Sequence, residues 1–136
     1  KLDQKILKRL IENCVKIKIE IVEKDEKEKN LRQILNYGHT FGHAVEKQSN
    51  YTLLHGFAIS LGMVLANRIA VEKNILKQQD FDCIKNLLFR AGLPVYTMHK
   101  PTLKDIQTDK KKHGNFVNLI LPTRIGETII HKVKIA

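Results

Sequence analysis

Long stretches with apolar residues at helical spacing alternate along this chain with short breaks that are charged or rich in glycine and proline. Apolar side chains recur every three or four positions from about Asp3 to Lys24, which predicts an amphipathic helix with Asp3 as its N-cap. The charged segment Glu23–Asn30 predicts a connector. A second helix is predicted from about Leu31 to Gln48. A third, from about Leu54 to Lys73, is apolar almost all round and should be buried.

The last third of the chain changes character. A helix from about Asp80 to Arg90 should end before Gly92, and a short helix is predicted from about Thr102 to Lys111. Two runs rich in β-branched residues flank Thr123–Gly126 and predict a hairpin over about residues 115–134. The expected fold class is therefore mainly α, a multihelical single domain of 136 residues that ends in a small β-hairpin.

The helix predicted from Leu31 carries polar residues where a core-facing stripe would be expected. Arg32, Asn36, His39 and His43 follow one another at spacings of four, three and four, which places them on one face of a continuous helix. His55 lies in the first turn of the next predicted helix. Imidazoles bind metals, and Arg and Asn bind anionic oxygens, so the stripe indicates either a metal or anion site or a structural polar seam.

Two details of this segment bear on that choice. Thr40 stands where the HExxH metalloprotease motif has its glutamate, so the pair of histidines is not that motif. Gly38 and Gly42 lie four residues apart, and each costs about 1 kcal/mol against alanine inside a helix. Close approach of another backbone or of a ligand would explain that cost.

Composition narrows the partners. The net charge is +10, from 24 Lys and Arg against 14 Asp and Glu, but only 6% of the residues are aromatic. Without aromatic side chains interleaved among the basic ones, a solvated lysine-rich surface or a phosphorylated small molecule is favoured over nucleic acid. No apolar run is long enough to predict a membrane span. Cys14 and Cys83 stand alone, which predicts two reduced, buried thiols in a cytoplasmic protein.

Several motifs in sequence order carry a resemblance to a known family. They are VKIKIEIV, DEKEKNLRQILNYGHTFGHAVE, LLHGFAISLGM, AGLPV, DKKKHG and NLILPTRIGE. Together they resemble the C-terminal helical domain of 3-dehydroquinate synthase, a sugar phosphate cyclase, over nearly the whole chain. GHTFGHAVE with a downstream HG is the specific part. The resemblance implies a lyase of the shikimate pathway of aromatic amino acid biosynthesis, which converts 3-deoxy-D-arabino-heptulosonate 7-phosphate to 3-dehydroquinate and phosphate.

The resemblance also implies cofactors. His39 and His55 match the family's metal-binding histidines, for zinc or cobalt, and the third ligand is a glutamate of an N-terminal domain. That domain also binds NAD. The chain contains no Gly-rich nucleotide loop, so the N-terminal NAD-binding domain is expected to be absent and the chain alone inactive. Its partners would be the sugar phosphate, the N-terminal domain and, in the full enzyme, a second copy in a homodimer.

The remaining site residues are carried over one at a time. Arg32, Asn36 and His43 match residues that hold the substrate's carboxylate or phosphate, and His43 and Lys18 are the expected catalytic residues. Lys110 matches a further phosphate contact.

Some readings stay open. Phe57 stands where the family commonly has Glu, so the chain departs from the family pattern at this position. The alternatives are a related cyclase, such as an aminodehydroquinate or 2-deoxy-scyllo-inosose synthase, a metal-dependent polyol dehydrogenase, or a basic helical binding module.

Overall fold

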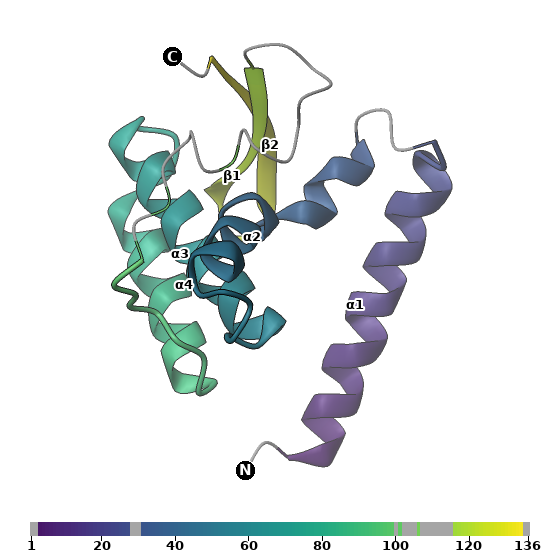
Figure 1. Cartoon of the computed structure of the whole chain (residues 1–136). Coiled ribbons are helices and arrows are strands. Elements are labelled where there is room, and N and C mark those ends of the chain that lie inside the picture. Colours follow the sequence, from purple (N-terminus) through teal and green to yellow (C-terminus); the bar gives the residue numbers. More distant parts are fainter. Residues whose placement is uncertain (1–2, 28–30, 100, 102–105, 107–115, 135–136) are drawn as a thin grey trace. The chain divides into compact units, whose positions relative to one another are not determined.

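The structure, a computed structural model, describes residues 3–27, 31–99, 101, 106 and 116–134 (Figure 1). The backbone contacts divide the chain into two compact units. Unit 1 is Lys1–Leu35 and unit 2 is Asn36–Ala136. The expectation of a single domain stays a prediction. The short helix expected from Thr102 to Lys111 lies almost wholly outside the described residues, and so does Lys110.

Unit 1 contains the helix α1, Gln4–Lys24. The Asp3 carboxylate accepts a hydrogen bond from the Lys5 backbone N–H at 2.7 Å, which confirms Asp3 as the N-cap. None of the residues of α1 is buried, although the helix carries a broad apolar stripe. Cys14 lies on this helix and is an exposed free thiol, as is Cys83 in unit 2. The prediction that both cysteines are buried was wrong.

The predicted helix from Leu31 to Gln48 is in fact two elements. A 3₁₀ helix, η1, covers Leu31–Asn36, and the α-helix α2 covers His39–Gln48. Gly38 separates them in the left-handed conformation, with φ of 81°. The apolar spacing predicted one continuous helix although the backbone breaks at Gly38, because side-chain spacing carries no information about a single positive φ angle.

Unit 2 is built on α3, His55–Glu72, which packs against α2, against α4 (Gln78–Arg90) and against the first hairpin strand. Most of the middle of α3 is buried, as predicted. The helix α4 ends at the predicted place, where Gly92 adopts a φ of 79°.

The hairpin consists of β1, Phe116–Arg124, and β2, Glu127–Lys134, paired antiparallel (Figure 1). Leu119 and Leu121 on β1 are fully buried against the helices, and each contributes about 1.5–3 kcal/mol by leaving water. The prediction of a mainly helical fold with a terminal hairpin is thus confirmed. None of the helices in the described part of the chain is long and apolar enough to cross a membrane.

Close backbone packing joins α2 to α3. A Cβ placed on Gly62 of α3 would lie 2.0 Å from the Gly38 carbonyl oxygen and 2.6 Å from the Gly42 nitrogen. A Cβ on Gly38 would meet Met63, and one on Gly42 would meet Ile59 at 2.7 Å. The expected close approach at Gly38 and Gly42 is confirmed, and Gly62 is its partner. This contact sets the distance between the two helices that carry the histidines.

Candidate metal and substrate site

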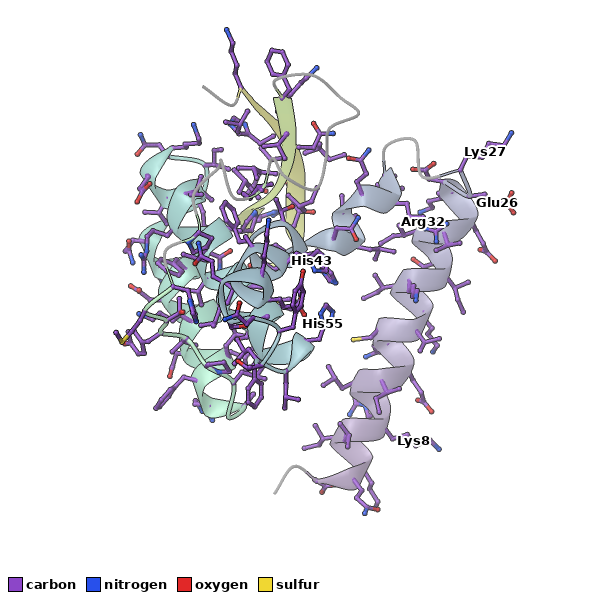
Figure 2. The ribbon with its side chains drawn as sticks, in the orientation of Figure 1. Lys8, Glu26, Lys27, Arg32, His43 and His55 are labelled. Carbon is purple, nitrogen blue, oxygen red and sulfur yellow. The ribbon has the colours of Figure 1, made fainter. Side chains whose placement is uncertain are left out.

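Three histidines converge where α2 and α3 begin. His39 is the first residue of α2, His43 lies one turn later, and His55 is the first residue of α3. The ring centroids of His39 and His55 are 5.5 Å apart, those of His39 and His43 are 5.7 Å apart, and those of His43 and His55 are 5.8 Å apart. Figure 2 shows His43 and His55 beside one another. We refer to these three residues as the histidine cluster.

The loop between the helices returns the chain to this cluster. Asn50 and Tyr51 both adopt positive φ, 51° and 58°, which reverses the chain direction within a few residues. The Tyr51 backbone N–H donates to the Glu46 carbonyl at 2.8 Å, and the Ser49 hydroxyl donates to the same oxygen at 2.8 Å. These hydrogen bonds fix the C-terminal end of α2, and the first residue of α3, His55, lies close enough to contact Glu46.

Glu46 joins two members of the cluster. Its Oε2 lies 2.8 Å from His43 Nδ1, and its Oε1 lies 2.8 Å from His55 Nδ1. The Glu46 side chain is only 13% exposed, whereas those of His43 and His55 are 53% and 58% exposed. The hydrogen bond with His43 is the main cause that lowers the pKa of Glu46, with a further contribution from His55, so the carboxylate is ionised at neutral pH.

His39 is held differently. Its Nδ1 lies 3.3 Å from the backbone carbonyl oxygen of Tyr37, which can only accept, so Nδ1 carries the hydrogen. The Tyr37 hydroxyl bonds to Asn67 Oδ1 in the interior. Asn67 is fully buried, and its Nδ2 has no hydrogen-bond partner among the described residues. Burial raises the pKa of Tyr37 to about 12, partly offset by the bond to Asn67. Tyr37 thus anchors the start of α2.

This donor set suits a metal. In all three histidines the Nδ1 atom is engaged by an oxygen, which leaves Nε2 as the remaining ring nitrogen. Metal-binding imidazoles usually make this kind of contact through their second nitrogen, because it fixes both the tautomer and the ring orientation. One nitrogen or oxygen atom each from His43, Glu46 and His55 lies within 4.8 Å of the others, and the two hydrogen bonds to Glu46 hold these side chains together.

The predicted stripe is only partly assembled. Asn36 ends η1 and is exposed, and Arg32 lies within η1. In a 3₁₀ helix residues three apart share a face, so Arg32 and Asn36, four apart, do not form the predicted row. The expectation of one continuous helical stripe through Arg32, Asn36, His39 and His43 was therefore wrong. The binding and catalytic roles of these residues stay predictions.

Two of the predicted residues belong to unit 1. Lys18 is exposed on α1. The Arg32 backbone N–H donates to Asp25 Oδ2 at 3.0 Å, and its Nη1 donates to the Glu26 carbonyl at 3.2 Å. Figure 2 shows Arg32 beside Glu26. Proximity of Lys18 and Arg32 to the histidine cluster stays a prediction.

Comparison with known proteins decides the family. The sequence model described as 3-dehydroquinate synthase C-terminal matches residues 1–112. The chain belongs to this family. It is 44% identical over 132 residues to the 3-dehydroquinate synthase of Sulfurovum sp. (strain NBC37-1), covering 91% of this chain and 37% of that protein. It is 43% identical over 136 residues to the 3-dehydroquinate synthase of Desulforamulus reducens, covering 96% of this chain and 38% of that protein. The chain thus spans less than two-fifths of the length of these relatives.

Solved structures agree with the fold of the 3-dehydroquinate synthase C-terminal family. A 2-deoxy-scyllo-inosose synthase in complex with carbaglucose-6-phosphate, NAD⁺ and Co²⁺ matches with a TM-score of 0.78 and 27% identity, over 96% of this chain and 40% of that one. A 2-epi-5-epi-valiolone synthase from Streptomyces hygroscopicus, with NAD⁺ and Zn²⁺ bound, matches with a TM-score of 0.76 and 24% identity, over 90% of this chain and 35% of that one, which supports the fold alone.

Sequence reasoning missed Glu46, Tyr37 and Gly62. Glu46 carried a usable signal, because it follows His43 by three residues and His39 by seven, so it shares their face of α2. Its contact with His55 could not be read from spacing, since that histidine lies on another helix. Tyr37 and Gly62 act through contacts 30 and 20 to 24 residues away in sequence, which no local pattern reports.

Proposed function

We propose that this chain supplies the metal- and substrate-binding part of a 3-dehydroquinate synthase. That enzyme converts 3-deoxy-D-arabino-heptulosonate 7-phosphate to 3-dehydroquinate and phosphate. The observation that carries the proposal is the histidine cluster, whose ring centroids lie within 5.8 Å of one another. In each ring Nδ1 contacts an oxygen, so Nε2 is the nitrogen left to bind a metal or the substrate. The chain's membership of the 3-dehydroquinate synthase C-terminal family supports this reaction, and the histidine cluster is consistent with it.

In this proposal His39 and His55 bind a divalent metal, zinc or cobalt, through Nε2. A third ligand and most of the NAD site would come from the part of the relatives that this chain does not span. When bound, such a metal polarises the substrate hydroxyl that NAD⁺ oxidises, and so lowers the pKa of that hydroxyl. The structural neighbour with NAD⁺ and Co²⁺ supports this kind of cofactor pair.

The remaining residues would hold the anionic substrate. The rings of His39 and His55 are 5.5 Å apart and each opens a helix, so the positive ends of two helix dipoles lie at the histidine cluster. His43 would donate a hydrogen bond or exchange a proton at Nε2. Arg32 and Asn36 would bind the carboxylate or phosphate, with Lys18 as a further catalytic residue. Lys110, outside the described residues, is proposed as a phosphate contact.

A chimeric enzyme tests the proposal. This chain replaces the matching C-terminal part of the Sulfurovum relative, and release of inorganic phosphate from the heptulosonate phosphate is measured with NAD⁺ and Zn²⁺ or Co²⁺. We expect turnover by the chimera and none by the 136-residue chain alone. His39→Ala or His55→Ala should lower the rate by about 100-fold or more, because a metal supplies several kcal/mol of transition-state stabilisation.

The matched control is His131→Ala, which removes an imidazole that lies on β2, paired with Leu119, and is not a member of the histidine cluster. If His39→Ala and His55→Ala leave the rate of a folded chimera unchanged, the proposed metal ligands are wrong. If the chimera binds NAD⁺ and is folded but releases no phosphate while the parent enzyme does, this chain does not supply the proposed part of the enzyme.

A related cyclase is the second candidate, because 2-deoxy-scyllo-inosose synthases share the fold at 27–28% identity. The curated relatives described above, at 43–44% identity, favour 3-dehydroquinate synthase. Assaying the same chimera with a hexose 6-phosphate separates the two: preferential turnover of the hexose phosphate would favour the second candidate.

A further inference from the structure

We propose that Glu46 is a positioning residue that holds His43 and His55 together in the tautomer with the hydrogen on Nδ1, leaving Nε2 of each ring as the nitrogen that binds. The inference deepens the proposed function and rests on it for the identity of the bound groups. The geometry of Glu46 itself is independent of the reaction, because it involves only this chain's own side chains.

Glu46 bridges the two imidazoles. One carboxylate contacts two imidazoles at the same distance, 2.8 Å, through separate oxygens. The two histidines belong to different helices, His43 to α2 and His55 to α3. Glu46 therefore does more than pair with a neighbour on its own helix. It fixes the ring orientation of one histidine against the other across the α2–α3 interface.

The charge on Glu46 sets the direction of both hydrogen bonds. An ionised carboxylate accepts hydrogen bonds and donates none. Both imidazoles must therefore present Nδ1–H to Glu46, and in a neutral ring the lone pair then lies on Nε2. His39 reaches the same tautomer through the Tyr37 carbonyl, so all three rings of the cluster have the same nitrogen left over.

The contacts and burial of Glu46 favour a positioning residue over a direct metal ligand. Both Glu46 oxygens already accept a short hydrogen bond. The carboxylate is also mostly shielded, at 13% exposure, while the two imidazoles are more than half exposed. The two imidazoles are therefore the more accessible groups for an incoming ligand, and the carboxylate is the shielded one.

Glu46→Gln tests the inference, because glutamine keeps the shape but offers one accepting oxygen and one donating amide group. Only one imidazole can then keep Nδ1–H toward residue 46, and the other must accept at Nδ1 and carry its hydrogen on Nε2. Nitrogen NMR shifts of ¹⁵N-histidine in the metal-free 136-residue chain, at about pH 8 where imidazoles are ordinarily neutral, report the tautomers directly.

In the wild-type chain we expect His39, His43 and His55 all with hydrogen on Nδ1. In Glu46→Gln, either His43 or His55 should change to the Nε2–H tautomer while His39 stays unchanged as an internal control. Zn²⁺ affinity, measured by competition with a chromogenic chelator, should fall about 10- to 100-fold, as for other residues that orient metal-binding histidines. Glu46→Asp, which accepts only, should keep both tautomers and recover part of the affinity.

Glu127→Gln is the matched control, because Glu127 also accepts side-chain hydrogen bonds, from Thr123 and Arg124, but in the hairpin. It should change neither tautomers nor Zn²⁺ affinity. Unchanged His43 and His55 tautomers in a folded Glu46→Gln chain would overturn the inference. So would Zn²⁺ bound through Nδ1 of these rings. The tautomers are read without substrate or metal, so failure of the chimera to release phosphate would refute the proposed function and leave this result standing.

Discussion

The contact between Gly62 and the start of α2 gives a sharp prediction. In Gly62→Ala the new methyl group would lie 2.0 Å from the Gly38 carbonyl oxygen, where ordinary contact is 3.4–4 Å. The obstacles are backbone atoms, Gly38 O and Gly42 N, so no side chain can rotate away. The helices α2 and α3 must move apart, or one of them must distort locally.

The size of the effect follows from two opposing terms. Overpacking a well-packed interior costs about 1–3 kcal/mol and sometimes more, and rigid backbone obstacles place this site at the upper end. Alanine regains about 1 kcal/mol of helix propensity relative to glycine. We therefore expect Gly62→Ala to lower the free energy of unfolding by about 2 kcal/mol or more, and the melting temperature by roughly 5–10 °C.

The assay is urea unfolding followed by circular dichroism, with Gly56→Ala as the control. Gly56 lies in the same helix, and a Cβ there would meet nothing within 4 Å, so the control should be neutral or more stable by up to about 1 kcal/mol. Gly62→Ala should also disturb the Glu46–His55 contact, which crosses the helix interface, more than the Glu46–His43 contact within α2. Equal stabilities of the two variants would refute this reasoning.

Further predictions concern the interior and the response to pH. Burial raises the pKa of Tyr37 from 10.0 to about 12, so the protonated hydroxyl stabilises the fold in full below about pH 10. About 2–3 kcal/mol of the free energy of unfolding should be lost as the pH rises toward 12. Tyr37→Phe should remove that loss in urea unfolding compared at pH 9 and pH 11.5, and an unchanged loss would contradict the assignment. Near neutral pH, Tyr37→Phe should lower the free energy of unfolding by about 1–3 kcal/mol, because it leaves Asn67 Oδ1 unsatisfied. The double variant with Asn67→Leu should lose less stability than the sum of the two single variants, and strict additivity would refute the coupling. The hydrogen bond from the Thr123 hydroxyl is the main cause that lowers the pKa of Glu127, followed by Arg124. The ionised carboxylate should therefore stabilise the chain above about pH 4.5, and this stabilisation should be lost as the pH falls through the lowered pKa. Melting temperatures of the wild type and Glu127→Gln at pH 7 and pH 3 check the direction of this pH dependence. Leu121→Ala should cost about 2–5 kcal/mol, because the side chain is fully buried and leaves a cavity, and a cost below 1 kcal/mol would show that the site collapses freely.

Local sequence patterns determined most of the element types. The Asp3 cap, the buried helix from His55, the stop at Gly92 and the terminal hairpin all follow from interactions between residues close in sequence, or from apolar periodicity, and the structure contains them. Family motifs in the sequence also pointed to the fold that the comparisons confirm. The break at Gly38 was not predicted, because a run of helical spacing continues through a single residue of positive φ.

The candidate site depended on tertiary structure. His39 and His43 are neighbours on one helix by spacing alone, but His55 joins them only because a loop with two positive-φ residues and a glycine contact at Gly62 bring α3 against α2. Glu46 could be placed on the face of His43 from the sequence. Its bridge to His55, which selects the nitrogen that each ring leaves available, is decided by packing between helices, since a hydrogen bond depends on distances that no one-dimensional pattern contains.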